Sequence, residues 1–264
     1  MRTMNRFEGR RVLVTGAGSG IGQASVLRIL SEGGRVVAAD RSEAGLADTV
    51  SKAGAGADRL TEIVLDIGNE QSVRAGVASA VDALGGLDAL VNAAGILRSS
   101  HTHETSLDQF EQILRVNLVG TFLVIRESIP ALLEGERPAV VNFSSTSATF
   151  AHPYMAAYAA SKGGVLSMTH ALAAEYAKQG IRFTAVQPGS ISSGMTDGSG
   201  QSKASTGPGL PEDADMALYA KLQPAIGQGF AGPETVASVV AMLASEDAAF
   251  ITGTEIRIDG GTHY

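Results

Sequence analysis

Residues 11–22 have the sequence RVLVTGAGSGIG, in which a short β-branched run leads into a glycine-rich turn and then into a helical pattern. Glycines at such a turn let the backbone bend sharply and approach a pyrophosphate, whose charge is received by free N–H groups at the helix N-terminus. The spacing is Thr-Gly-x-x-x-Gly-x-Gly and not Gly-x-Gly-x-x-Gly. We therefore expect a strand, a turn and a helix with a nucleotide phosphate site here, and a turn without a ligand is the alternative.

Further β-branched runs alternate with helical patterns along the chain. Strands are expected at residues 11–15, 35–39, 59–65, 87–91, 139–143, 182–187 and 254–258. Such alternation is typical of βαβ units that build a parallel sheet covered on both faces. Ser42, Asn69 and Ser106, each followed closely by an acidic residue, stand where helices should begin. The sequence thus predicts an α/β fold, a doubly wound Rossmann-type parallel sheet of about seven strands in a single domain spanning residues 1–264.

The composition excludes several classes of protein. Of the 264 residues 44% are apolar and 18% are charged, the formal net charge is −7, and there is no cysteine. The apolar content is too high for a disordered chain, and the lack of cysteine excludes disulfide frameworks and cysteine zinc sites. The acidic balance argues against a nucleic-acid surface. With no signal sequence and no long apolar run, we expect a cytoplasmic protein without a membrane span.

Asp40 ends the second expected strand, 18 residues after Gly22. A carboxylate at this place can accept hydrogen bonds from the adenosine ribose hydroxyls of NAD, and it repels the 2′-phosphate of NADP. Arg41 follows directly and could meet such a phosphate, but Asp40 would first have to turn away. NAD is therefore favoured over NADP, and the alternative is that Asp40 merely caps the next helix.

Tyr158 and Lys162 lie four residues apart in an alanine-rich stretch, residues 153–178, that has a helical pattern. This spacing puts both side chains on one face of the helix. An ammonium group close to a phenol stabilises the phenolate, so this tyrosine is a candidate general acid or base.

Residues 192–209 interrupt the regular pattern, because they are rich in Ser, Gly, Thr and Pro and contain hardly any apolar residue. Long irregular segments inside compact domains are often functional lids, and a plain surface insertion is the alternative. We expect a mobile lid that becomes ordered when ligands bind, within a substrate-facing loop at residues 192–230.

Taken in order, these motifs resemble the short-chain dehydrogenase/reductase family in its core-length group, from the first strand to the C-terminus. The segments that carry the resemblance are 15–22 (TGAGSGIG), 66–67 (DI), 92–95 (NAAG), 116–120 (VNLVG), 144–145 (SS), 158–162 (YAASK), 188–191 (PGSI), and 251–253 (ITG) leading to 259–261 (DGG). The resemblance implies the doubly wound fold, an NAD(P)-dependent oxidoreductase, and a homotetramer or homodimer.

The resemblance also implies roles for four catalytic residues. Tyr158 would be the general acid or base, and Lys162 would hold the nicotinamide ribose and lower the pKa of Tyr158. Ser145, 13 residues before Tyr158, would hydrogen-bond the substrate oxygen. Asn117 would support a water-mediated proton relay to Lys162.

Further positions are implied for the coenzyme and the substrate. The coenzyme positions are Gly16, Ser19, Gly20, Ile21 and Gly22 at the pyrophosphate, Asp40 and Arg41 at the adenosine ribose, Asp66 and Ile67 at the adenine, Asn92 and Gly95 beside the nicotinamide, Tyr158 and Lys162 at its ribose, and Pro188, Ile191 and Ser193 around the carboxamide. The substrate positions are Ser145, Ser147, His152, Tyr158, Gly189 and Met195. No metal site is expected, because His101, His103 and Glu104 have no further ligand at a recognised spacing.

These residues predict an NAD-dependent enzyme that interconverts a secondary alcohol and a ketone by hydride transfer, with Tyr158 as the acid or base. One alternative is an NADPH-dependent ketone or 3-oxoacyl reductase, in which Arg41 reaches the 2′-phosphate. A second is a non-catalytic NAD-sensing protein, which would have no need to keep all four catalytic residues. The expected substrate is a small molecule, and steroids, polyols, hydroxy acids and cyclic alcohols all remain open.

Overall fold

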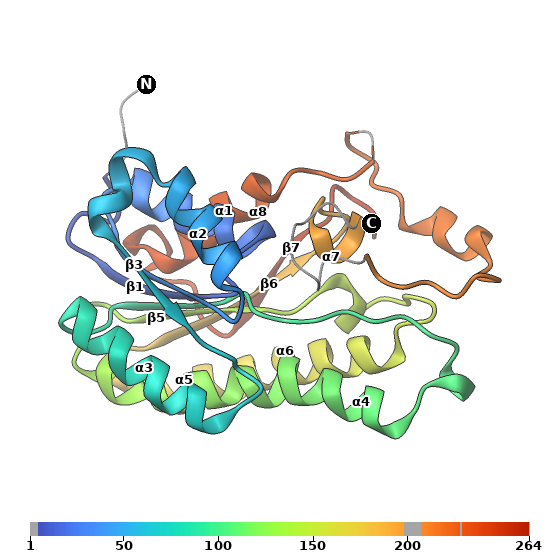
Figure 1. The fold of residues 1–264 in the computed structure, drawn as a ribbon, viewed down its shortest axis with the longest axis horizontal. Helices are drawn as coiled ribbons and strands as arrows, with labels where there is room; N and C mark the ends of the chain where they lie inside the picture. The colour runs from blue at the N-terminus through green and yellow to red at the C-terminus, as the bar shows by residue number, and fades with distance from the viewer. Residues whose placement is uncertain (1–4, 198–206, 228, 264) are drawn as a thin grey trace.

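A seven-stranded parallel sheet forms the centre of the molecule in a computed structural model that describes residues 5–197, 207–227 and 229–263 (Figure 1). The strand order is β3-β2-β1-β4-β5-β6-β7. The strands are β1 (Arg11–Thr15), β2 (Arg35–Asp40), β3 (Leu60–Val64), β4 (Ala89–Asn92), β5 (Ala139–Phe143), β6 (Arg182–Pro188) and β7 (Thr254–Ile258). The order reverses between β1 and β4, and in sheets of this type ligands bind at the carboxyl ends of the strands beside such a reversal.

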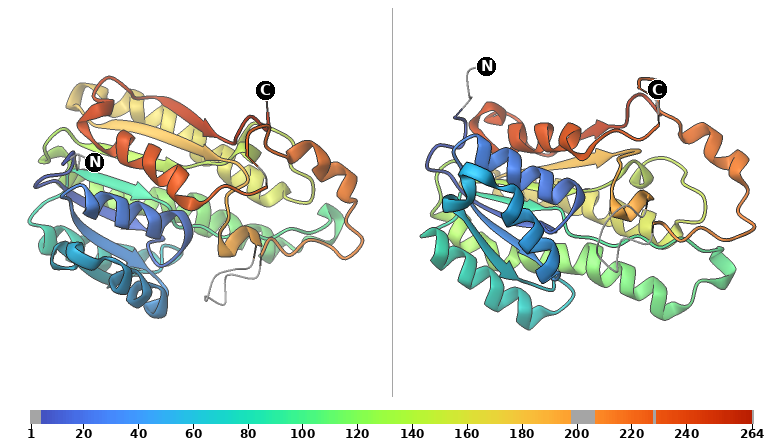
Figure 2. Two further views of the ribbon diagram at one scale, coloured as in Figure 1. Left: turned by 90° about the horizontal axis from the view of Figure 1, so that it is seen from above. Right: turned by 45° about the horizontal axis from the view of Figure 1, so that its top comes forward.

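Helices cover both faces of the sheet (Figures 1 and 2). One face carries α1 (Gly20–Ser31), α2 (Glu43–Lys52) and α8 (Pro233–Ala244); the other carries α3 (Glu70–Leu84), α4 (Leu107–Leu114), α5 (Thr121–Leu133) and α6 (Ala156–Tyr176). The shorter elements are α7 (Gly194–Asp197), a π-helical turn η3 (Arg115–Gly120) between α4 and α5, and the 3₁₀ turns η1 (Gly54–Arg59), η2 (Thr102–Glu104), η4 (Thr146–Ala148), η5 (Ala177–Gln179), η6 (Met216–Leu222) and η7 (Glu246–Ala248).

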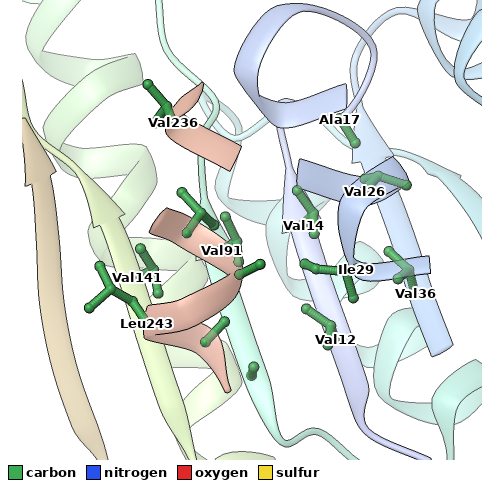
Figure 3. Packing of buried hydrophobic residues seen from close by; sticks show 14 of the residues in the cluster. Val12, Val14, Ala17, Val26, Ile29, Val36, Val91, Val141, Val236 and Leu243 are labelled. Atoms are coloured by element: carbon green, nitrogen blue, oxygen red, sulfur yellow. The ribbon is translucent and has the colours of Figure 1, made fainter. Parts of the chain in front are cut away.

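The alternation of side chains along each strand divides the core into two layers. Val12 and Val14 of β1 pack under α1 and α8 with Val26 and Leu243 (Figure 3), whereas Leu13 between them packs on the opposite face. Both faces of a central strand are therefore covered, which explains why the strand sequences are continuously apolar.

The predicted fold is confirmed. All seven expected strands are present, with ends that differ by at most two residues, and α6 occupies most of the expected stretch at residues 153–178. The predicted helix starts are also correct, because Ser42, Asn69 and Ser106 each accept a hydrogen bond from a backbone N–H of the first turn at 3.0–3.2 Å. Such caps satisfy N–H groups that have no partner within the helix.

The expectation of an irregular segment at residues 192–209 is only partly correct. Gly194–Asp197 form the short helix α7, Gly207 N–H donates to the Gly194 carbonyl at 3.2 Å, and residues 198–206, with Gly198 and Gly200, lie outside the described part. A lid that becomes ordered on binding therefore stays a prediction.

The helical run Leu107–Leu133 is long and apolar enough to cross a bilayer, with a mean hydropathy of 1.5. Half of its most apolar window is buried inside the fold, where α4 packs on α6 and α5 packs on α3. A core helix of a soluble protein has the same length and composition, so this run is weak support for a membrane span.

Candidate active site

A cavity of about 480 Å³ lies at the carboxyl ends of the strands, beside the reversal of strand order. The segment that contains η6, drawn in orange, extends beyond the strand ends at this side of the molecule (Figures 1 and 2). Most of the residues expected from the sequence line the cavity. They are Gly16, Ser19, Gly20, Ile21, Gly22, Asp40, Arg41, Asp66, Ile67, Gly95, Ser145, His152, Tyr158, Lys162, Pro188, Gly189, Ile191, Ser193 and Met195.

The glycine-rich turn between β1 and α1 brings bare backbone to the cavity. Gly16 has a φ of +69°, and a Cβ on Gly22 would lie 2.0 Å from the Gly16 carbonyl oxygen, so neither position tolerates a side chain. The N-cap residue Ser19 makes no side-chain bond to the helix, and the first turn of α1 has no acidic residue. The N–H groups at this positive helix end can therefore bind an anion, and the pyrophosphate of a dinucleotide would fit there.

Asp40 is held in place by two backbone N–H groups. Its Oδ2 accepts from Gly18 at 3.0 Å, and its Oδ1 accepts from Ser42 at 2.9 Å. Arg41 also lines the cavity, so both residues that bear on the choice between NAD and NADP are present there. Because Asp40 is tied to both the glycine turn and the start of α2, turning it away would break two charge-assisted bonds.

The side chains of Ser145, Tyr158 and Lys162 meet at one wall of the cavity. Ser145 follows β5, and the other two lie one turn apart on α6, where Tyr158 is 9% and Lys162 is 5% exposed. The Ser145 hydroxyl hydrogen-bonds Tyr158. Lys162 Nζ donates to the Phe143 carbonyl at 2.8 Å and lies 5.7 Å from the centre of the Tyr158 ring.

Burial dominates the acid–base properties of this group. It raises the pKa of Tyr158 to about 12, against a smaller lowering effect of the bond with Ser145, and it lowers the pKa of Lys162 to about 8. The expectation that Lys162 lowers the pKa of Tyr158 stays a prediction, and in this structure burial opposes it. Both charged forms are desolvated, and the lysine makes its hydrogen bond to a backbone carbonyl and not to the phenol.

Asn117 lies behind this wall and does not line the cavity. It belongs to the π-helical turn between α4 and α5, where its Oδ1 accepts from the Ile96 N–H at 2.8 Å and its Nδ2 donates to the Ile96 carbonyl at 2.9 Å and to Ser161 Oγ at 3.0 Å. A Cβ on Gly95 would lie 3.1 Å from Asn117 Oδ1 and 3.5 Å from Lys162 Nζ. The structure therefore places Asn117 close to Lys162, as the expected relay requires.

Two other expected residues do not line the cavity. Asn92 is 3% exposed, and its Nδ2 donates to Asn142 Oδ1 at 2.9 Å, as part of a chain of polar contacts across β4 and β5 that ends at Thr169 on α6. Ser147 is 5% exposed, and its N–H donates to Ser145 Oγ at 3.2 Å. Both side chains are buried outside the cavity lining, so the expected contacts of Asn92 and Ser147 with ligands stay predictions.

The structure adds lining residues that the sequence analysis did not identify. They include Leu97, Leu210, Met216, Tyr219, Leu222, Thr262 and His263. These residues follow different strands, and no spacing connects them in the sequence. The nearest signal is the position of Thr262 and His263 directly after the Asp-Gly-Gly motif at residues 259–261.

Comparison with known proteins agrees with this geometry. A family model described as short chain dehydrogenase matches residues 10–204. The 3-oxoacyl-[acyl-carrier-protein] reductase of Thermotoga maritima is 35% identical over 97% of this chain and 98% of that protein.

Two solved structures have the same fold over nearly the whole chain. A short chain dehydrogenase from Mycobacterium paratuberculosis bound to NAD has a TM-score of 0.86 and 29% identity, and covers 97% of this chain and 98% of its own. A short chain dehydrogenase from Burkholderia cenocepacia in complex with NADP has a TM-score of 0.84 and 30% identity, and covers 97% of this chain and 99% of its own. Similar chains thus bind either coenzyme.

Proposed function

The chain belongs to the short-chain dehydrogenase family, an oxidoreductase family acting on CH–OH or ketone groups, and on that premise we propose that it interconverts a secondary alcohol and a ketone with NAD as coenzyme. One observation carries this proposal. Ser145, Tyr158 and Lys162 meet at one wall of the cavity, and the glycine-rich turn in the same cavity offers backbone N–H groups to an anion. A proton donor and a coenzyme site in one cavity are what hydride transfer to a carbonyl requires.

In the proposed reaction the protein positions the substrate oxygen and moves one proton. Ser145 donates a hydrogen bond to that oxygen, and Tyr158 exchanges the proton with it: the neutral phenol gives it to a ketone, and the phenolate takes it from an alcohol. NAD, when bound, supplies the acceptor for the hydride that leaves the carbinol carbon. Lys162, whose pKa is lowered to about 8 by burial, would hold the nicotinamide ribose when NAD is bound, and a water-mediated relay supported by Asn117 would carry the proton between Lys162 and the solvent.

The proposed preference for NAD rests on Asp40. Its carboxylate is fixed by Gly18 and Ser42, so it stays where it can accept bonds from ribose hydroxyls and repel a 2′-phosphate. Titration of the enzyme with both coenzymes tests this preference. The catalytic efficiency should be higher with NAD(H), and an equal or higher efficiency with NADP(H) would contradict it.

One observation favours a second function, an NADPH-dependent ketone or 3-oxoacyl reductase. Arg41 lines the cavity beside Asp40, and the Thermotoga maritima relative is a 3-oxoacyl-[acyl-carrier-protein] reductase. A panel of secondary alcohols with NAD, set against 3-oxoacyl thioesters with NADPH, separates the two functions. The NAD proposal predicts NADH formation from at least one alcohol, and turnover only of the thioesters with NADPH would contradict it.

We also propose a homodimer or homotetramer in the cytoplasm. Phe122 and Leu133 on α5 and Phe250 before β7 are large apolar side chains with exposed fractions of 44%, 43% and 104%. Such side chains on an outer surface are favoured at protein–protein contacts. Light scattering on the purified chain tests the assembly, and a monomer at micromolar concentration would contradict it.

A further inference from the structure

The wall of the cavity beside Tyr158 is apolar. Leu97 and Met155, which are 6% and 9% exposed, form a hydrophobic cluster with Tyr158, and Met195 and Tyr219 pack against it. These side chains come from the loop after β4, the approach to α6, the helix α7 and the turn η6. The reacting tyrosine therefore belongs to an apolar chamber that four separate segments build.

Apart from Lys162, which lies beside Tyr158, the charged side chains that line the cavity lie outside the apolar chamber. Asp40, Arg41 and Asp66 are at the ends of β2 and β3, and Lys162 donates its hydrogen bond to the Phe143 carbonyl. Of the lining residues that the structure describes, no other is Asp, Glu, Lys or Arg. A carboxylate, sulfonate or phosphate at the end of the apolar chamber away from Lys162 would have no counter-ion among the described lining residues, which is strongly unfavourable.

The two histidines at this end do not supply a counter-ion either. Burial lowers the pKa of His152, whose Nδ1 donates to the Phe150 carbonyl at 3.2 Å and whose Nε2 lies 3.2 Å from Thr146 Oγ1. His263 stacks on Phe150 with 4.1 Å between ring centres, and its Nδ1 lies 3.1 Å from Asp259 Oδ2. Burial therefore favours the uncharged form of His152, and the Asp259 carboxylate lies against His263.

The hydroxyl groups of the chamber are already committed to the protein. Three of them donate to backbone carbonyls: Tyr219 to Pro153 at 3.1 Å, Thr196 to Ile191 at 2.6 Å and Thr262 to Asp259 at 2.7 Å. A sugar or other polyol would bring several hydroxyls into this space, where these three protein hydroxyls can still accept but not donate. His263 Nε2 is the buried lining side-chain atom without a partner in the described part of the chain. Buried polar groups without hydrogen bonds are costly, so the chamber disfavours polyols as it disfavours anions.

We propose that the substrate is an uncharged, predominantly apolar secondary alcohol or its ketone, with the apolar body held among Leu97, Met155, Met195 and Tyr219. This inference rests on the proposed function, because it assigns the substrate class of the same site. It excludes substrates whose body carries a terminal anionic group or several hydroxyls.

The first test measures kcat/KM with NAD for a homologous series of 2-alkanols, and for 2-octanol against 7-hydroxyoctanoate and against sorbitol. Each added methylene should raise kcat/KM about fourfold until the chamber is full. The carboxylate should be at least about tenfold worse than 2-octanol, because it differs in having a charge at the far end. A preference for the carboxylate or for sorbitol would overturn the inference.

The second test introduces a cation at the chamber. Met216 lines the cavity and is 60% exposed, so that a polar side chain there should not disturb the core. Met216→Arg should raise the ratio of kcat/KM for 7-hydroxyoctanoate to that for 2-octanol by about tenfold relative to the matched neutral variant Met216→Gln. An unchanged ratio would contradict the placement of the substrate body at this wall.

The two proposals fail in different ways. If NAD binds in calorimetry but no alcohol or ketone in the series reacts with either coenzyme, the proposed function fails, and the substrate class fails with it. If the charged or polyhydroxylated compounds react best, the proposed function stands and only the substrate class is wrong.

Discussion

Buried polar groups are paired differently at the two ends of the parallel strands. We call the side where the strands begin the amino edge and the side where they end the carboxyl edge. At the amino edge, Arg10 donates to four backbone carbonyls at 2.9–3.3 Å, and Arg182 donates to the carbonyls at Leu243 and Ser245 at 3.0 and 2.9 Å. Asp88 accepts from the Arg11 guanidinium and from two backbone N–H groups. The end of α8 and the starts of the central strands are thus joined by groups whose hydrogen bonds are all made within the protein.

At the carboxyl edge, several buried polar atoms have no hydrogen-bond partner in the described part of the chain. Four of the five such side-chain atoms are Asn92 Oδ1, Ser99 Oγ, Ser147 Oγ and His263 Nε2. Asn92 is the last residue of β4, and the other three lie in the segments that follow β4, β5 and β7. Unpaired buried polar groups lower stability. The comparison teaches that the hydrogen bonds at the amino edge contribute to stability, whereas the carboxyl edge, which holds Tyr158 and Lys162, leaves several buried polar atoms unpaired at a cost in stability.

The largest expected effect is at the carboxyl edge. Tyr158→Phe removes the proton donor and should lower kcat by about 10³-fold, with the midpoint of thermal unfolding and the affinity for NAD almost unchanged. Steady-state kinetics and calorimetry measure these quantities. The matched control is Tyr176→Phe at the far end of α6, which should keep full activity. Substantial turnover by Tyr158→Phe would refute its assignment as acid or base.

A substitution at the amino edge should lower stability and leave the activity of the folded enzyme almost unchanged. Arg10→Met leaves four carbonyls without their donor and should lower the free energy of unfolding by about 3 kcal/mol, while kcat/KM of the folded enzyme stays within about twofold of the original. Arg35→Met is the control, because this residue is exposed and makes only one contact, at 3.5 Å. A loss of activity without a loss of stability in Arg10→Met would invalidate the comparison between the two edges.

A smaller effect is expected at the adenosine end of the cavity. Asp40→Asn removes the charge that repels a 2′-phosphate, so the ratio of kcat/KM with NAD to that with NADP should fall by about tenfold. Coenzyme titrations measure the ratio, and Asp48→Asn on the adjacent helix α2 is the control. If the ratio does not change, Asp40 does not determine the choice of coenzyme.

The smallest effect on activity is expected for Tyr154, which connects the η6 segment to the rest of the apolar chamber. Tyr154, at a φ of +63°, accepts a hydrogen bond from the Asp215 N–H at 2.9 Å, and His101 contacts both its ring and the carboxylate of Asp213. Tyr154→Phe removes the bond to the η6 segment and should raise KM for an apolar alcohol about threefold, with kcat unchanged. A change in kcat alone would contradict this positioning role.

The same contact predicts a weak pH dependence. The hydrogen bond to Asp213 raises the pKa of His101, so the ion pair is fully formed below the ordinary pKa of histidine and is lost as the pH rises through the raised value. KM for an apolar alcohol should therefore rise over that range in the wild type. His101→Gln should remove this dependence, and its persistence in the variant would assign it to another group.

The coenzyme half of the site could be predicted from sequence because its signals are local. A strand, a glycine turn and a helix are contiguous at residues 11–31, and Asp40 ends the next strand. Tyr158 and Lys162 also have a local signal, their spacing of four residues within one helical pattern, whereas Ser145 was identified from the family resemblance. Short-range geometry determines where such residues lie.

The rest depends on contacts between distant segments. A motif does not say toward which side a side chain turns, so the sequence could not indicate that Asn92 and Ser147 lie outside the cavity lining. The raised pKa of Tyr158 follows from burial by residues remote in sequence. Leu97, Tyr219 and His263 share one cavity only after β4, β5, β6 and β7 are assembled in one sheet. No periodicity connects these three positions.

The central claim is that this carboxyl edge transfers a hydride from a secondary alcohol to NAD. The most direct test is to incubate the enzyme with NAD and 2-octanol deuterated at the carbinol carbon, and to determine the mass of the reduced coenzyme. The account predicts reduced coenzyme that carries the deuterium, together with 2-octanone. Reduced coenzyme without deuterium, or ketone formed without reduced coenzyme, would contradict it.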